Sequence, residues 1–260
     1  MTGVGRAFVV GTGEVGRRLA TALAVAGWAT IPVTRERGWE AALREDDPAP
    51  RIVAVREEDL GAVLERLTGP LRSRAVLVQS GFLEAVHGPL GPVTRGLLWL
   101  TAKEAFFSVL CKSQFHGPLA GAIAGTLGTG GIPCSVLEGR DDFLRAMIVK
   151  GAWNAVVGLP LAVHRMSLAA YLESQRDEME ALIDECARAA GAEYGVEASA
   201  AVAERKLLET TTRLGWVKGG TRALAWRNGA IARFGRRHAI PTPVNDRLLR
   251  AAGADPDAAT

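Results

Sequence analysis

The feature that most constrains the fold of this chain is a glycine-rich segment near its start, which follows a β-rich run, Arg6 to Val10, and opens a helical run, Glu14 to Ala26. Its glycines have the spacing G-x-G-x-x-G. Between a strand and a helix, the first glycine permits a tight turn, the second lets the backbone approach a pyrophosphate, and the third allows close packing of helix on strand. The N–H groups at the helix amino terminus attract phosphate. We therefore predict a dinucleotide-binding loop formed by Gly11, Thr12, Gly13, Glu14, Val15 and Gly16.

Short β-rich runs alternate with helical runs through the rest of the first half, which is typical of a parallel α/β sheet. The expected strands are Ala29 to Thr34, Arg51 to Val55, Arg74 to Gln79 and Pro133 to Leu137, with two more between Val93 and Cys111; the expected helices are Trp39 to Arg44, Glu57 to Leu67 and Pro118 to Leu127. From Arg140 onward the apolar spacing is helical, over Phe143 to Val157, Ser167 to Ala190, Ser199 to Leu214 and Ala223 to His238, with Gly191 as a C-cap. We expect an α/β plus all-α protein, with a doubly wound Rossmann-type domain over residues 1–139 and a helical domain for substrate binding and dimerisation over residues 140–260.

Composition excludes several classes of function. Hydrophobic residues make up 48% of the chain and charged residues 23%, as in ordinary soluble globular proteins. The three cysteines, Cys111, Cys134 and Cys186, are far apart and lack a C-x-x-C spacing, so we expect no disulfide framework, no metal site and a reducing, cytoplasmic location. The start of the chain lacks a signal-peptide pattern, and we expect no apolar run long enough to span a bilayer.

Charge is unevenly distributed along the chain. The net charge of +3 is small, but basic residues outnumber acidic ones between Arg205 and Arg250. These positive residues are interleaved with apolar helix positions and lack RNP-like or helix-turn-helix signals, so we expect neither nucleic acid nor a membrane as a partner. An anionic small molecule or the subunit interface of a homodimer explains the charge equally well.

The residues after the second expected strand bear on the choice between NAD and NADP. NAD-binding folds place Asp or Glu there, about 20 residues beyond the glycine loop, to hold the ribose 2′-hydroxyl. Here Thr34 takes that position, and Arg35 and Arg37 flank Glu36. Because a guanidinium group matches a phosphate, Arg35 favours NADP(H). Two alternatives remain open: Glu36 takes the role of the acid, or the arginines belong to a solvated loop.

A second candidate site is the pair Lys150 and Asn154 in the run Lys150-Gly151-Ala152-Trp153-Asn154. Four residues apart on a helix, the two side chains share one face. A protonated lysine beside a carboxamide donor can give a proton to an alkoxide and hold it in place, which is half of a carbonyl reduction. Taken alone, such a pair is more often a solvated helix face.

With these motifs in place, the chain resembles the ketopantoate reductase (2-dehydropantoate 2-reductase) family. Beyond the glycine loop, the resemblance rests on Gly130-Gly131-Ile132-Pro133 ahead of the helix with Lys150 and Asn154, on Asn228-Gly229-Ala230, and on His238-Ala239-Ile240-Pro241-Thr242-Pro243-Val244-Asn245. On the sequence alone the last segment is a rigid helix terminator, because proline fixes φ and removes a donor. The resemblance implies an NADP-binding domain and a helical domain with the active site in the cleft between them. It makes Lys150 the general acid and Asn154 a substrate-orienting residue.

Other matched positions divide into those that keep a polar group and those that lose it. Arg56 stands where the family has a lysine near the cofactor, Ser80 replaces an asparagine beside the nicotinamide, and Thr211 replaces a serine near the substrate. In contrast, the family's second asparagine falls on Gly158 and its substrate-binding glutamate falls on Ala223. Each lost hydrogen bond costs about 1–3 kcal/mol, so we expect carbonyl reduction without ketopantoate itself as the substrate.

Three functions remain open at this stage. The favoured one is NADPH-dependent reduction of a small 2-oxo acid or related carbonyl. The alternative is an NADP(H)-binding sensor or assembly protein that has lost catalysis, and a third is an enzyme of the same fold acting on imines or amino-acid-derived substrates. The four histidines show no metal-ligand spacing and are expected to be structural or at the surface: His87, His116, His164 and His238. We expect three tryptophans to pack the fold or to form a dimer contact: Trp153, Trp216 and Trp226.

Overall fold

The computed structural model describes residues 5–103 and 106–257, which form two compact units. One unit comprises Met1–Gln79 and Pro89–Phe143, and the other comprises Ser80–Gly88 and Leu144–Thr260. The division thus falls after Phe143, where the sequence-based ranges 1–139 and 140–260 place it after Gly139. In addition, the short segment Ser80–Gly88 belongs to the second unit, although it directly follows a strand of the first.

The first unit is built on a seven-stranded sheet with the order β2-β1-β3-β4-β5-β8-β9. Neighbouring strands are parallel except β5 and β8, which pair antiparallel. From β1 the chain passes to β2 on one side and then returns to β3 on the other, as in doubly wound sheets, whose ligands bind at the carboxyl ends of the strands. The strands are β1 (Arg6–Val10), β2 (Ala29–Val33), β3 (Arg51–Val53), β4 (Ala75–Leu77), β5 (Thr94–Leu97), β8 (Ser113–His116) and β9 (Cys134–Val136).

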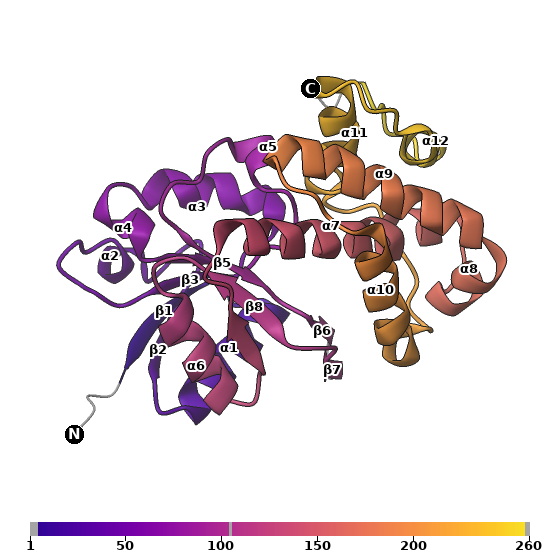
Figure 1. Ribbon diagram of the computed structural model, residues 1–260. Helices are drawn as coiled ribbons and strands as arrows, with labels where there is room; N and C mark the ends of the chain where they lie inside the picture. Colours follow the sequence, from indigo (N-terminus) through magenta and orange to yellow (C-terminus); the bar gives the residue numbers. More distant parts are fainter. Residues whose placement is uncertain (1–4, 104–105, 258–260) are drawn as a thin grey trace. The chain divides into compact units, whose positions relative to one another are not determined.

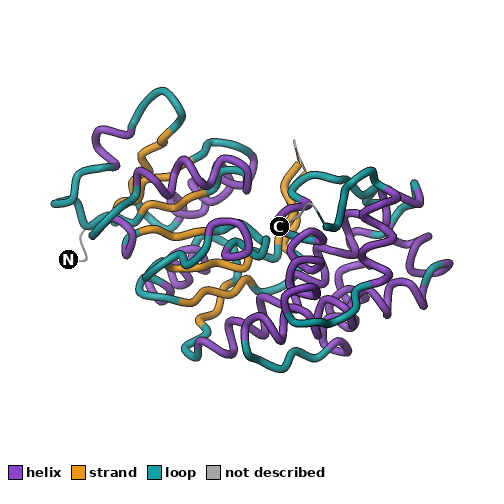
Figure 2. The backbone as a smooth tube through the Cα atoms, turned by 90° about the horizontal axis from the view of Figure 1, so that it is seen from above, coloured by secondary structure: helices purple, strands orange, loops and turns teal. Residues whose placement is uncertain are grey.

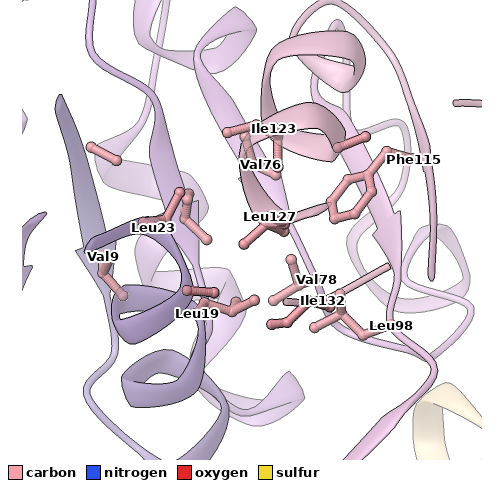
Figure 3. Packing of buried hydrophobic residues seen from close by; sticks show 14 of the residues in the cluster. Val9, Leu19, Leu23, Val76, Val78, Leu98, Phe115, Ile123, Leu127 and Ile132 are labelled. Atoms are coloured by element: carbon pink, nitrogen blue, oxygen red, sulfur yellow. The ribbon is translucent and has the colours of Figure 1, made fainter. Parts of the chain in front are cut away.

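Helices cover both faces of this sheet, with α1 (Glu14–Val25) and α6 (Ala120–Thr129) on one face and α3 (Leu60–Arg66) on the other (Figure 1). The face under α1 and α6 holds the hydrophobic core of the unit. Val9 of the sheet packs there with Leu19 and Leu23 of α1 and with Ile123 and Leu127 of α6 (Figure 3). This buried face fixes α1 against β1 and so positions the turn between them. The unit also contains α2 (Trp39–Ala42), η1 (Glu57–Asp59) and α4 (Pro70–Ser73).

The prediction of two strands between Val93 and Cys111 was wrong. Three strands lie there, because β5 is followed by β6 (Leu100–Lys103) and β7 (Phe106–Val109), which form a separate antiparallel hairpin. Residues 104–105 between them lie outside the described part of the chain. Strand β8 was not predicted from the sequence. Its Ser113 and Phe115 are buried and alternate with less buried neighbours, which is the period-2 pattern of a strand.

The second unit is helical, and all described strands belong to the first (Figure 2). Ser167 and Ser199 cap two of its helices by accepting hydrogen bonds from the backbone N–H groups of Ala170 and Val202. The α/β plus all-α prediction is therefore confirmed. The helices are α5 (Glu84–His87), α7 (Arg140–His164, which begins in the first unit), α8 (Leu168–Ser174), α9 (Arg176–Tyr194), α10 (Ala200–Leu214), η2 (Leu224–Trp226), α11 (Asn228–Arg237) and α12 (Pro243–Ala251).

Two helix predictions in this unit were wrong. Ser167 to Ala190 is not one helix, because the chain breaks at Gln175 between α8 and α9, and the C-cap of α9 is Gly195, with φ +67°, rather than Gly191. Gly191 lies inside α9, where a Cβ would lie 2.8 Å from the Val196 carbonyl oxygen. Close packing, and not helix termination, explains this glycine. Likewise, the predicted helix from Ala223 is divided into η2 and α11, because Ala223 has the left-handed φ of +57°.

Helix α7 also corrects the expectation that no apolar run is long enough to span a bilayer. An 18-residue window of α7 has a mean hydropathy of 1.5, and the helix is long enough by length and composition. However, 61% of that window is buried inside the fold, as in the core helix of a globular unit. The apolar character of α7 is explained by packing.

Candidate active site

The glycine loop has the conformation that its sequence predicts. Gly11 has φ +94°, and its N–H donates to the Val33 carbonyl oxygen at 2.9 Å. A Cβ at Gly16 would overlap the Gly11 carbonyl oxygen, so only glycine allows α1 to pack this closely on the turn. Gly13, the N-cap residue of α1, has no atom within 4 Å of the position of a Cβ, and no side chain caps the helix.

These features fit a pyrophosphate. Thr12 and Gly13 are exposed, Glu14 and Val15 form the first turn of α1, and the N–H groups of an uncapped helix start are the donors that phosphate uses. The loop can therefore hold the phosphates of a dinucleotide through backbone groups alone.

The segment after β2 forms a tight turn at the surface. The Thr34 N–H donates to the Arg37 carbonyl oxygen at 3.0 Å, and the Glu36 N–H reaches the Thr34 hydroxyl at 3.4 Å. The side chain of Arg35 is 85% exposed and pairs with Asp59 at 2.8 Å. Exposed ion pairs contribute little to stability, so this guanidinium can exchange Asp59 for another anion. Arg56 is exposed as well, directly after β3 at the start of η1.

Gln79, which the sequence analysis noted only as part of the turn after β4, has a defined role in the first unit. Its amide donates to the carbonyl oxygens of Val53 and Val55, both at 3.0 Å, and so ties the carboxyl end of β4 to that of β3. The side chain is 5% exposed. A polar side chain directly after a buried parallel strand is the signal that could have identified it.

Lys150 and Asn154 lie on α7 in the second unit and are 3% and 5% exposed. The alternative that they form a solvated helix face is therefore wrong. The Lys150 ammonium lies 3.8 Å from the centre of the Trp153 ring, and the Asn154 amide donates to the Ser80 carbonyl oxygen at 2.8 Å. Lysines are rarely this buried, which separates this pair from an ordinary helix surface.

The segment that carries Ser80 is tightly packed against the helices of its own unit. The Phe82 N–H donates to the Trp226 carbonyl oxygen at 2.8 Å, and a Cβ at Gly81 would lie 2.5 Å from the Trp226 Cβ. A Cβ at Gly151 would overlap the Phe82 ring. Main-chain contacts thus hold Ser80 beside Asn154. The ring of Phe82, which packs on α7 at Gly151, holds the segment as well.

The three remaining candidate positions have a different character. Gly158 accepts a hydrogen bond at its carbonyl oxygen from the Gly220 N–H at 3.2 Å, and a Cβ at Gly219 would overlap that same oxygen. Ala223 is 6% exposed and presents only a methyl group. The Thr211 hydroxyl donates to the Leu207 carbonyl oxygen at 2.8 Å. Main-chain packing occupies the space beside Gly158, and none of the three positions supplies a side-chain amide or carboxylate.

The Asn-Gly and Ile-Pro-Thr-Pro-x-Asn motifs are joined by hydrogen bonds between two buried asparagines. The Asn228 side-chain amide donates to the Asn245 side-chain oxygen at 3.0 Å, and the Asn245 side-chain amide donates to the main-chain carbonyl oxygen of Asn228 at 2.9 Å. The carboxylate of Glu185 accepts from the N–H groups of Val244 and Asn245 at 2.8 and 2.9 Å. Burial raises the pKa of Glu185, although these two bonds oppose it. The proline motif terminates one helix, as predicted, and Pro243 also begins the next, which the sequence analysis missed.

The histidines have structural partners. His164 and His238 contact Glu178 and Glu193 at 2.8 and 2.9 Å, carboxylates far away in sequence that spacing could not reveal. His116 bonds the Leu137 carbonyl oxygen, and Trp226 donates its indole N–H to His87 Nε2 at 3.2 Å. Within residues 5–103 and 106–257, no group of three or more His, Cys, Asp or Glu side chains is arranged to hold a metal ion.

Cys134 and Cys186 are free thiols. Burial raises the pKa of Cys134 to about 12 and raises that of Cys186 as well. A thiol that resists ionisation is a poor nucleophile. These two cysteines therefore belong to the packing of the fold.

Comparison with known proteins supports the sequence resemblance. Residues 142–254 match the family model of the ketopantoate reductase PanE/ApbA carboxy-terminal region. No curated protein matches the chain as a whole.

Solved structures share the fold over nearly the full length. The 2-dehydropantoate 2-reductase of Geobacter metallireducens GS-15 has a TM-score of 0.75 at 14% identity, covering 95% of this chain and 99% of that one. A dimeric ketopantoate reductase from Staphylococcus aureus has a TM-score of 0.71 at 17% identity, covering 95% and 99%. D-Mandelate dehydrogenase in complex with NADH has a TM-score of 0.72 at 14% identity, covering 98% and 100%. At these identities the likeness establishes the fold.

Proposed function

Through its carboxy-terminal region the chain is a divergent member of the ketopantoate reductase family, and on that premise we propose that it is an NADP(H)-dependent oxidoreductase. Its substrate is a small 2-oxo acid or a related carbonyl compound. The observation that carries the proposal is the buried face of α7, where an ammonium group and a carboxamide lie one turn apart. Such a pair supplies the proton and the orientation that a carbonyl needs when it accepts a hydride.

Lys150 and Asn154 divide the chemistry between them. NADPH, when bound at the glycine loop, supplies the hydride. As negative charge grows on the substrate oxygen, the Lys150 ammonium stabilises it and transfers a proton to it. Asn154 has two amide hydrogens, and since one is used by the Ser80 carbonyl oxygen, the other can orient the substrate.

The turn after β2 supports NADP(H) as the cofactor. Thr34 offers no carboxylate to a ribose 2′-hydroxyl, and the exposed guanidinium of Arg35 can leave Asp59 to pair with a 2′-phosphate. We expect Arg35→Ala to raise the KM for NADPH about tenfold and to leave the KM for NADH nearly unchanged. Equal effects on both cofactors would contradict this role of Arg35.

The substrate is proposed to lack the hydroxyl group of ketopantoate. Gly158 and Ala223 provide no side-chain hydrogen bond, and the Thr211 hydroxyl is already bonded to Leu207. Two lost bonds of about 1–3 kcal/mol each correspond to roughly 10²- to 10⁴-fold in affinity for such a hydroxyl. A relative by fold, D-mandelate dehydrogenase, has been solved with NADH and anilino(oxo)acetate, which is consistent with oxo acids of other shapes.

The same glycine and alanine favour a second candidate, an NADP(H)-binding sensor or assembly protein without catalysis. Tight NADPH binding with no turnover of any carbonyl compound would support it. In either case we propose a cytoplasmic protein, because the thiols of Cys134 and Cys186 form no disulfide, and a homodimer, which light scattering can test.

The experiment that tests the main proposal is NADPH oxidation with a panel of 2-oxo acids. Because general acid catalysis contributes about 10²- to 10⁴-fold, Lys150→Ala is expected to lower kcat by that factor. The exposed Lys218, changed to Ala, is the matched control. Equal turnover by the wild type and Lys150→Ala would remove Lys150 from the mechanism.

A further inference from the structure

Trp153 lies between Lys150 and Asn154 on α7 and contacts the proposed proton donor. Its ring centre is 3.8 Å from the Lys150 ammonium, well inside the distance at which a cation is attracted to an indole face. The Trp153 side chain is only half-buried, whereas Lys150, whose ammonium lies on the ring, is 3% exposed. In such surroundings, with little water to compete, the attraction between ring and cation is strong.

The indole is itself held from a second helix. Its Nε1–H donates to the Thr210 hydroxyl on α10 at 2.8 Å. Thr210 is 1% exposed, and its hydroxyl donates in turn to the carbonyl oxygens of Leu207 and Lys206 at 2.9 and 3.1 Å. The Thr210 oxygen is thus oriented by α10 so that it can accept from Trp153, and rotation of the indole would leave a buried hydroxyl with one bond fewer.

We propose that Trp153, anchored by Thr210, is a positioning residue that fixes the Lys150 ammonium for proton transfer. This inference rests on the proposed function, since it assigns Trp153 a role only through Lys150. It gives Thr210, the neighbour of Thr211 on α10, a role in anchoring the indole. Trp153 is assigned no polar contact with a substrate, so its substitution is expected to act on kcat through Lys150.

The first measurement is independent of activity. The chain has five lysines, Lys103, Lys112, Lys150, Lys206 and Lys218, so a sample labelled with ¹³C-lysine gives few side-chain signals, and Lys150→Arg assigns one of them. Protons above an indole face resonate upfield because of the ring current. We expect an upfield Lys150 Hε signal in the wild type that is lost in Trp153→Leu and kept in Trp153→Phe. A wild-type signal at the ordinary position would overturn the proposal.

The second measurement is steady-state kinetics on the same variants. We expect Trp153→Leu to lower kcat about 10- to 100-fold with the KM for NADPH unchanged, because a misplaced catalytic group costs up to about that factor. Trp153→Phe keeps a ring face and is expected to lose less. Thr210→Val is expected to lower kcat about 3- to 10-fold, which corresponds to one lost hydrogen bond of roughly 1 kcal/mol, and Thr210→Ser is expected to restore it.

Matched controls are available in the same unit. Trp216→Phe makes the identical substitution at an exposed tryptophan, and Thr212→Val does so at an exposed threonine of α10. Both are expected to leave kcat unchanged. If Lys150→Ala lowers kcat while Trp153→Leu does not, the positioning role is contradicted and the proposed function stands. If Lys150→Ala has no effect, the proposed function fails, and the role of Trp153 fails with it even if the ring-current shift is observed.

Discussion

The two halves of α7 in the second unit contrast sharply. Around Lys150 and Asn154, each side chain has a defined polar or aromatic contact: the ammonium lies on Trp153, and the carboxamide bonds Ser80. One turn later, at Gly158, the helix instead packs against the main chain of Gly219 and Gly220. One half of this helix thus holds the proposed proton donor among side-chain contacts, and the other half makes main-chain contacts.

From this difference we propose that reaction type and substrate choice depend on different halves of α7. A proton donor depends on a few buried groups with a fixed geometry. Substrate recognition depends on hydrogen bonds that can be removed one at a time, each at a cost that only a particular substrate experiences. Substitutions in the two halves of α7 should therefore act on different quantities.

After Lys150→Ala, the largest expected effect is that of Asn154→Ala. It removes the amide that bonds Ser80 and that is proposed to orient the substrate oxygen, so we expect kcat/KM to fall about 100-fold, comparable to losing one donor from an oxyanion site. Steady-state kinetics with the best 2-oxo acid measures it. Gly158→Ala, in the other half of the helix, should change kcat/KM little. Equal losses in the two variants would remove the contrast.

A second effect concerns stability and uses two glycines of the same helix. A Cβ at Gly151 would overlap the Phe82 ring, so Gly151→Ala is expected to lower the free energy of unfolding by about 1–3 kcal/mol. At Gly158 the nearest atom to a Cβ is the Gly220 carbonyl oxygen at 3.6 Å, an ordinary contact.

Gly158→Ala should therefore raise the free energy of unfolding by about 0.5–1 kcal/mol through helix propensity. Urea unfolding of both variants beside the wild type makes the comparison. A loss of stability at Gly158 as large as that at Gly151 would show that this half of α7 is packed as tightly as the other.

The smallest expected effect is a pH dependence at His87, in the segment that carries Ser80. Burial lowers the pKa of His87, with Glu84 opposing the shift, and Nε2 accepts a hydrogen bond from Trp226 only while the imidazole is neutral. Since the folded-state pKa lies below the unfolded value of about 6.5, the contribution of His87 to stability is present above that pH and is lost as the pH falls.

Glutamine at position 87 retains an acceptor but does not titrate. We expect the wild type to lose stability relative to His87→Gln between pH 7.5 and 5.5, measured by urea unfolding. A difference between the two proteins that is constant across this range would show that His87 does not titrate with folding.

The parts of the fold that local sequence determines could be predicted. β1 begins and ends at the expected residues, and α1 begins at Glu14, because the glycine spacing and the helix period agree there. Gly191 was misinterpreted because local rules of helix termination ignore a neighbouring main chain. The start of α12 at Pro243 was missed, although proline is favoured in the first turn of a helix. The hairpin of β6 and β7 was missed because an apolar run does not show how many strands it contains.

The candidate site was predictable to a similar extent. The spacing of Lys150 and Asn154 gave their shared face, but not their burial. The sequence also placed Trp153 three residues from Lys150, where helical neighbours meet, yet its contact with the ammonium was not foreseen. That Ser80 belongs to the helical unit could not be predicted, because its contacts with Asn154 and its neighbours' contacts with Trp226 join residues far apart in the chain.

The central proposal is that Lys150 donates the proton while no side chain at Gly158 or Ala223 bonds a substrate hydroxyl. The most direct measurement is kcat/KM with NADPH for two substrates, ketopantoate and the same 2-oxo acid with its hydroxyl replaced by hydrogen. We expect the acid without the hydroxyl to be reduced at least as well as ketopantoate, and Lys150→Ala to lower both rates about 10²- to 10⁴-fold. A preference of about 100-fold or more for ketopantoate, which is the lower end of the range expected of two such hydrogen bonds, would contradict it.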